Sequence, residues 1–148
     1  MIDALKELFT RDLNRLKKEI QLYKDDETLW KVENSISNSG GNLCLHLIGN
    51  LKTFIGNGLS QNGYERKRDH EFSAKNIDRN EIYKEIDETI VIVEQAFQQM
   101  GVDQLEQNFP ILIWEKETGM KFTIIHLHSH LNYHLGQINY HRRLLEKS

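Results

Sequence analysis

A single proline, Pro110, occurs in a chain of 148 residues. The proline ring removes a backbone donor and clashes with the preceding helical turn, so helices rarely run through a proline. The long stretches on either side of Pro110 are therefore open to helix formation. This scarcity of proline favours an all-α fold.

Two amphipathic helices are predicted from hydrophobic periodicity. Over residues 2–23, apolar side chains recur at three- and four-residue spacing, which places them in one stripe with charged residues opposite. A second stripe of this kind runs from Asp78 or Asn80 to Met100, and Gly101 follows in the position usual beyond a last helical turn. Each helix is expected to bury one face.

Between these two helices, another helix is expected to begin near Asn42, with Ser39 or Asn42 as its N-cap, and to end at about Gly56 or Gly58. Its residues are apolar on nearly all sides. A helix of that kind is buried on most of its surface, so we expect it in the middle of a bundle. The polar residues 59–77 then form a long connection.

The last helix is expected from about Thr123 to Leu145, and residues 110–122 are compatible with a short β-hairpin whose returning strand is 120–122. Four helices of roughly 16 to 23 residues describe a four-helix bundle. We therefore predict a single domain over residues 1–148, with a long crossover after the second helix.

Charge argues against nucleic acid as the main partner. The formal net charge is -3, whereas phosphate binding favours a basic surface. The basic run Arg66, Lys67 and Arg68 is short and is followed by Asp69 and Glu71, so we interpret it as a solvated loop.

The single cysteine, Cys44, excludes an internal disulfide and fits a reducing compartment. It lies in an apolar stretch, where a cysteine usually serves as a small buried hydrophobic residue. No stretch approaches the roughly 18 apolar residues of a membrane span, and the amino terminus lacks a signal-peptide core. A cytoplasmic protein with no membrane partner is therefore expected.

The histidines carry the chemical signal of this sequence. Of seven histidines, five lie between positions 126 and 141, on the predicted last helix. Two histidines four residues apart lie on one helical face and can share one metal ion, a condition that both His126/His130 and His130/His134 meet. All three together extend over roughly 12 Å along the axis, too far for bonds of about 2.1 Å to one ion. Spacing alone does not separate the two pairs.

A third ligand is expected from another helix. His46 is the remaining histidine inside a predicted helix, and its surroundings are almost wholly apolar. Burying an imidazole there costs free energy unless its nitrogens are satisfied, which a metal and a hydrogen-bond acceptor would do. Three neutral histidines leave an open coordination position, as in catalytic sites. The alternative is that the histidines are structural or exposed, which we expect of His126, His128 and His141.

A family resemblance distinguishes the two pairs. The segment His130-Leu-Asn-Tyr-His134-Leu-Gly-Gln-Ile138 resembles the last-helix motif of the DinB-like (YfiT-like) four-helix-bundle proteins. The stretch 42–51 is similar to their second helix and aligns His46 with that family's third histidine. The resemblance extends over nearly the whole chain, and residues 65–72 resemble a stretch seen in one branch. It implies that His46, His130 and His134 bind one divalent metal.

The resemblance implies a metal-dependent enzyme that acts on a small molecule. A low-molecular-weight-thiol S-transferase is the first expectation. The alternatives are a metal-dependent hydrolase and a non-catalytic, dimerising metal-binding stress protein. Three histidines suit nickel or zinc, which we favour, and also cobalt or iron. A homodimer is expected, because the apolar second helix offers more surface than one chain can cover.

No catalytic residue is assigned from the sequence. An HExxH motif is absent, so no glutamate base stands beside the ligands. Asp69 or Glu71 in the connection after the second helix is a candidate to reach the site. Asn132 and Tyr133 lie between the ligands in sequence but on other helix faces, where we expect them to pack or to face solvent.

Overall fold

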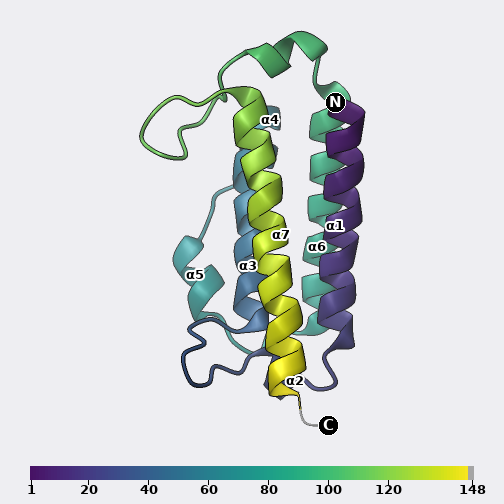
Figure 1. Cartoon of the computed structure of the whole chain (residues 1–148), viewed down its shortest axis with the longest axis vertical. Coiled ribbons are helices and arrows are strands. Elements are labelled where there is room, and N and C mark those ends of the chain that lie inside the picture. Colours follow the sequence, from purple (N-terminus) through teal and green to yellow (C-terminus); the bar gives the residue numbers. More distant parts are fainter. Residues whose placement is uncertain (147–148) are drawn as a thin grey trace.

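The computed structural model describes residues 1–146, and four long helical segments dominate it (Figure 1). They run side by side along the long axis of the molecule, and the all-α prediction is confirmed. The long segments are α1 (Ile2–Leu22), α3 (Gly40–Leu51) with its continuation, α6 (Arg79–Gln99) and α7 (Met120–Leu145). Shorter helices are α2 (Asp26–Leu29), α5 (Arg68–Ser73) and the 3-10 helix η2 (Val102–Glu106).

Helix α3 is the most deeply buried element. Every residue of it except Leu45 is buried, as its apolar sequence predicted. The helix continues through a π-helical stretch, η1 (Lys52–Asn57), into α4 (Gly58–Ser60). The predicted end near Gly56 or Gly58 is therefore close to the observed one, and the wider π turn forms part of one continuous helical rod.

Helices α1 and α6 are amphipathic and pack against each other. The rings of Phe9 on α1 and Phe97 on α6 lie 5.5 Å apart, and both side chains are almost fully buried. Stripes of this kind drive bundle formation because each removes one apolar face from water.

Side-chain caps fix the starts of two of the long helices, α3 and α6. Ser39 caps α3 by accepting a hydrogen bond from the backbone N–H of Asn42, so Ser39 is the cap of the two candidates. Asp78 caps α6 through the N–H of Asn80. At the other end of α6, Gly101 has a φ of -84°, so it does not adopt the left-handed conformation expected of a closing glycine.

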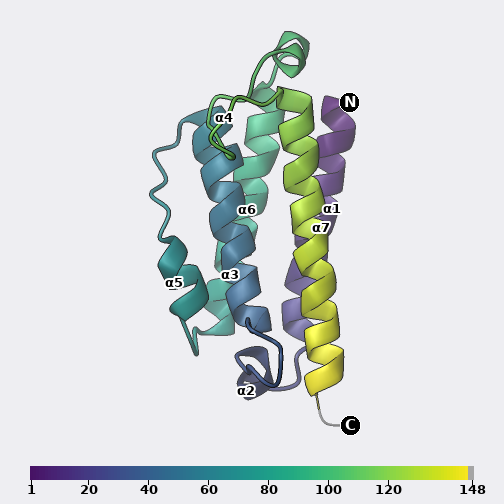
Figure 2. The ribbon, with the colours of Figure 1, turned by 60° about the vertical axis from the view of Figure 1, so that its left-hand side comes forward.

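The connection after α4 is not a plain loop. It contains α5, which lies alongside α3 (Figure 2). Asn42 on α3 donates its side-chain N–H groups to the backbone oxygens of Glu71 and Ala74, at 2.9 and 2.8 Å. These bonds hold α5 against the middle of the bundle.

The hairpin expected near residues 110–122 is much smaller in the structure. One isolated antiparallel bridge joins Asn108 and Gly119, and residues 1–146 contain no longer strand. Residues 120–122, predicted as the returning strand, instead form the first turn of α7. The helix begins at Met120 rather than near Thr123, because Gly119 already occupies the N-cap position.

Within residues 1–146, no helix combines the length and the apolar character that crossing a membrane requires.

Candidate metal centre

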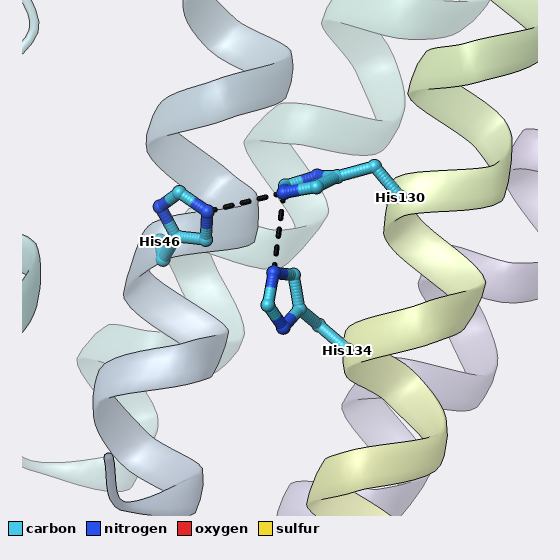
Figure 3. A group of neighbouring side chains, drawn as sticks. All are labelled: His46, His130 and His134. Atoms are coloured by element: carbon cyan, nitrogen blue, oxygen red, sulfur yellow. Dashed lines mark hydrogen bonds between the residues drawn. The ribbon is translucent and has the colours of Figure 1, made fainter. Parts of the chain in front are cut away.

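Three histidines from two helices converge in the middle of the bundle (Figure 3). His46 comes from α3, and His130 and His134 come from successive turns of α7. Nε2 of His130 lies 3.2 Å from Nε2 of His46 and 3.2 Å from Nε2 of His134. The structure thus brings together the three residues that the sequence singled out.

The spacing of these nitrogen atoms fits one ion. A tetrahedral ion with bonds of about 2.1 Å separates its donor atoms by about 3.4 Å. One nitrogen atom from each of the three rings lies within 4.8 Å of the other two, so the cluster could hold a metal ion. His46 is 6% exposed, and the other two histidines are partly buried. Three protein ligands leave room for a fourth.

A buried ion pair engages the far side of His46. Nδ1 of His46 lies 3.1 Å from Oε1 of Glu71, which comes from α5. The guanidinium of Arg66 donates to both oxygens of that carboxylate, at 2.9 and 3.0 Å. Glu71 is 5% exposed although it is acidic. Nη2 of Arg66 also lies 3.3 Å from Nδ1 of His46, but it makes its shorter contact, 3.0 Å, with Oε1 of Glu71. Because a carboxylate accepts and does not donate, the 3.1 Å contact with Oε1 assigns the proton to Nδ1 of His46 and leaves the lone pair of Nε2 directed at the centre.

His134 is oriented in the same way by a neighbour on its own helix. Its Nδ1 donates to Oε1 of Gln137 at 2.7 Å, which leaves Nε2 of His134 without a proton. Nδ1 of His130 is buried and has no hydrogen-bond partner within residues 1–146. Two of the three rings therefore have an acceptor at Nδ1, the arrangement usual around histidine metal ligands.

Counting protons supports a cation at this point. Nε2 of His46 and Nε2 of His134 both direct lone pairs toward Nε2 of His130. A single N–H on Nε2 of His130 can be directed well at only one of them, so at least one of these lone pairs is left without a donor. A bound cation would turn these contacts into attractive ones. The donor set therefore fits a divalent transition metal.

Burial favours the neutral forms of His130 and His134. Together with the neighbouring His134 and His46, burial lowers the pKa of His130 to about 4. Burial also lowers the pKa of His134, against the opposing effect of Gln137. Burial alone would raise the pKa of Glu71, but the hydrogen bonds from His46 and Arg66 outweigh it, and the pKa lies below its usual value. Neutral imidazoles and an ionised carboxylate are the forms that metal binding requires.

Aromatic rings surround the three histidines. Phe72 on α5 lies 4.9 Å from His46, and Tyr133 lies 5.2 Å from His134, measured between ring centroids. On the third side, His126 stacks on His130 at 6.3 Å and meets the ring of Trp114 at 4.5 Å. These rings give the centre an apolar rim.

A cavity of about 490 Å³ opens beside the centre. Tyr133 and Gln137 belong to its wall, so it adjoins His134 without including a ligand histidine. Leu43, Gly136 and Tyr140 complete much of its surface.

The remaining histidines lie outside the cluster. His128 contacts the buried Asp12 at 2.7 Å, and His141 is buried between the hydroxyl of Tyr23 and the carbonyl of Lys31. Both are structural, as expected. His126 is partly buried beneath Trp114.

The crossover supplies two residues whose roles the sequence left open or misassigned. Glu71 does reach the site, but at the outer nitrogen of His46, whereas Asp69 is exposed. Arg66 was interpreted as part of a solvated loop, and that interpretation is wrong for this residue, because its side chain is 16% exposed and bound to Glu71. Lys67 and Arg68 are exposed as expected. The signal that could have indicated Arg66 is its spacing from Glu71, five residues along.

Asn132 and Tyr133, the two polar residues between His130 and His134, pack or face solvent as expected. The side-chain N–H of Asn132 donates to Asp12, and Tyr133 is 66% exposed.

Comparison with protein families matches residues 1–148 to one family, described as "Protein of unknown function (DUF1572)". No curated protein matches the chain.

Proposed function

This chain belongs to the DUF1572 family, and we propose that it binds one divalent transition metal through His46, His130 and His134 and acts on a small molecule there. The observation that carries this proposal is the convergence of three Nε2 atoms, one from each histidine. Two of these atoms present lone pairs because Glu71 and Gln137 occupy the opposite ring nitrogens. A cluster that is only structural gains nothing from lone pairs directed at one another.

Three protein ligands favour a reactive centre over a closed structural one, because structural sites usually fill all four positions with side chains. A divalent ion held there would supply Lewis acidity that lowers the pKa of a thiol or water placed in the fourth position. The cavity beside Gln137 offers room for the rest of such a molecule. The surrounding rings of Phe72, Tyr133 and Trp114 would limit access of bulk water.

Within this proposal, transfer of a low-molecular-weight thiol to an electrophile is the first reaction to test. The resemblance to the DinB-like (YfiT-like) bundles suggests it, and one contact supports it. Glu71, the carboxylate that touches the cluster, is held by His46 and Arg66 and does not serve as a base for water. A thiol is more acidic than water and needs less help to ionise. Hydrolysis is the second candidate, because the same centre could activate water.

Metal analysis tests the binding proposal directly. The untagged protein is loaded with nickel or zinc, dialysed and analysed for metal, together with a His46→Ala/His130→Ala variant and a His70→Ala control. His70 is exposed and lies outside the cluster, so its removal changes the histidine content alone. We expect about one equivalent in the wild type and the control, and almost none in the folded double variant. Equal metal content in all three proteins would reject the centre.

Activity is tested on the loaded protein with a thiol and a chromogenic electrophile. We expect turnover that requires both the thiol and the metal and that falls at least 100-fold in His130→Ala. Turnover of a chromogenic ester without thiol would favour the hydrolase instead. Stoichiometric metal binding with neither reaction would indicate an ion that ties α3 to α7.

A further inference from the structure

The crossover between α4 and α6 contributes a residue to the centre that is not a ligand. Glu71 lies on α5, and its Oε1 is 3.1 Å from Nδ1 of His46. Burying a carboxylate to 5% exposure is costly unless it is paired, and Arg66 supplies that pairing through two N–H donors. The carboxylate of Glu71 therefore has two specific partners, the imidazole of His46 and the guanidinium of Arg66.

Helix α3 leaves a space for this carboxylate. Gly49 lies three residues after His46, on the neighbouring turn of the same helix. A Cβ at Gly49 would lie 1.8 Å from Oε2 of Glu71 and 2.6 Å from its Cδ. Any other residue at position 49 would displace the carboxylate. The absence of a side chain there is what lets Glu71 approach His46.

The backbone of α5 is fixed to the same helix by a separate contact. The side chain of Asn42, one turn before His46, donates to the backbone oxygens of Glu71 and Ala74. Asn42 is itself buried. The backbone of Glu71 is thus fixed by Asn42, and its carboxylate is fixed by the ion pair with Arg66. The absence of a side chain at Gly49 leaves room for this carboxylate beside Nδ1 of His46.

We propose that Glu71 is a positioning residue that sets the affinity of the metal centre by holding His46 with its proton on Nδ1 and its Nε2 lone pair directed at the ion. This inference rests on the proposed function. A negative carboxylate at Nδ1 also makes the opposite nitrogen a better donor. Glu71 makes no contact with a substrate in this role, because it lies behind the ligand and not at the open position.

Two variants disturb this contact in different ways. Glu71→Gln keeps an oxygen that can accept from His46 but removes the charge. Gly49→Ala leaves the carboxylate charged but takes its space, and it keeps every polar group of the centre. Each has a matched control: Asp69→Asn neutralises an exposed acid on the same short helix, and Gly119→Ala adds a methyl just before α7, where nothing lies within 4 Å.

The experiment is a titration of each metal-free protein with zinc in competition with a chromogenic chelator. We expect Glu71→Gln and Gly49→Ala to bind about 10- to 100-fold more weakly than the wild type, the usual cost of disturbing a partner of a histidine ligand. The two controls should stay within about twofold. A purely structural Glu71 would instead lower the urea midpoint of the metal-free protein and leave the zinc affinity unchanged.

Nitrogen NMR of the zinc-loaded protein gives a second readout. In the wild type we expect the ring proton of His46 to be on Nδ1. In Glu71→Gln we expect the resonance of that nitrogen to shift. Wild-type affinity in both Glu71→Gln and Gly49→Ala, or a proton on Nε2 of His46 in the loaded wild type, would overturn the positioning role while leaving the metal centre intact. Absence of zinc binding in the wild type would overturn the proposed function and this inference with it.

Discussion

Nε2 of His46 and Nε2 of His130 lie 3.2 Å apart, although 84 residues separate them in the chain. His46 belongs to α3 and His130 to α7, so this contact joins the buried central helix to the last one. Two like atoms at that distance repel when both carry lone pairs. The packing of α3 against α7 thus holds these histidines in an arrangement that could bind a metal ion.

Metal binding is expected to stabilise the fold. A ligand that binds only the native state at 100 times its dissociation constant adds about 2.7 kcal/mol to the free energy of unfolding. For a chain of this length, that corresponds to a rise in melting temperature of about 5–10 °C. Thermal denaturation with excess zinc, and with a chelator, measures the difference.

The control for this prediction is His130→Ala, which lacks the atom common to both short contacts. Its melting temperature should respond to zinc by no more than about 1–2 °C. An equal rise in the variant would place the stabilising zinc elsewhere on the protein.

Cys44 is expected to be inert in the native protein. Its side chain is fully buried on α3, and burial raises the pKa of the thiol. The thiolate is the reactive form, so alkylation requires both deprotonation and access. Native protein at pH 8 should incorporate almost no iodoacetamide over an hour, whereas protein in urea should react fully, as mass spectrometry would show. Rapid native alkylation would contradict the burial of this residue.

The helices were predictable because their signals are local. The stripes along α1 and α6 and the all-round apolar sequence of α3 depend on residues three and four apart, which share a face whatever the rest of the chain does. His46 could be selected for the same reason, since a lone imidazole in that setting needs partners. The prediction of a β-hairpin near Pro110 was wrong because residues 120–122, its proposed returning strand, form the first turn of α7.

The rest of the site depends on tertiary placement. His126/His130 and His130/His134 have equal spacing, so periodicity could not separate them. The resemblance favoured the second pair, and the position of α3 beside α7 makes that pair converge with His46. Glu71 comes to His46 across 25 residues, through a crossover whose path no periodic pattern specifies. The sequence indicated the three histidines, but Glu71 behind His46 could be found only from the fold.

His141 is expected to make the stability of the metal-free protein depend on pH. Burial lowers its pKa from the ordinary 6.5, against an opposing hydrogen bond to the carbonyl of Lys31. Because the folded pKa lies below the unfolded one, the unfolded chain takes up a proton first as pH falls. Stability is therefore complete above about 6.5 and is lost as pH falls toward the folded pKa.

Urea unfolding of the chelator-treated protein between pH 7.5 and 5 measures this slope. His130 and His134 contribute in the same direction, since their pKa values are also lowered. Replacing His141 with Gln should flatten the dependence, and replacing the exposed His70 with Gln should leave it unchanged. A slope that stays the same in His141→Gln would show that the pKa of His141 does not differ between the folded and unfolded states.

Away from the centre, Asp12 is the polar residue whose replacement is expected to lower the free energy of unfolding most. It is fully buried on α1 and accepts hydrogen bonds from Arg11, His128 and Asn132, which joins α1 to α7. Burial alone would raise the pKa of Asp12, but these donors outweigh it and the pKa lies below its usual value. Its contribution to stability is thus present above the unfolded pKa of about 3.8 and is lost as pH falls through the lower folded value.

Replacing Asp12 with Asn removes the charge and turns one acceptor oxygen into an N–H group that faces other donors. We expect a loss of roughly 2–3 kcal/mol in the free energy of unfolding at pH 7, because hydrogen bonds to a buried charged group are lost. Asp3→Asn, an exposed acid on the same helix, should change it by less than about 0.5 kcal/mol. If both variants unfold at the same urea concentration as the wild type, the contact between α1 and α7 does not depend on this carboxylate.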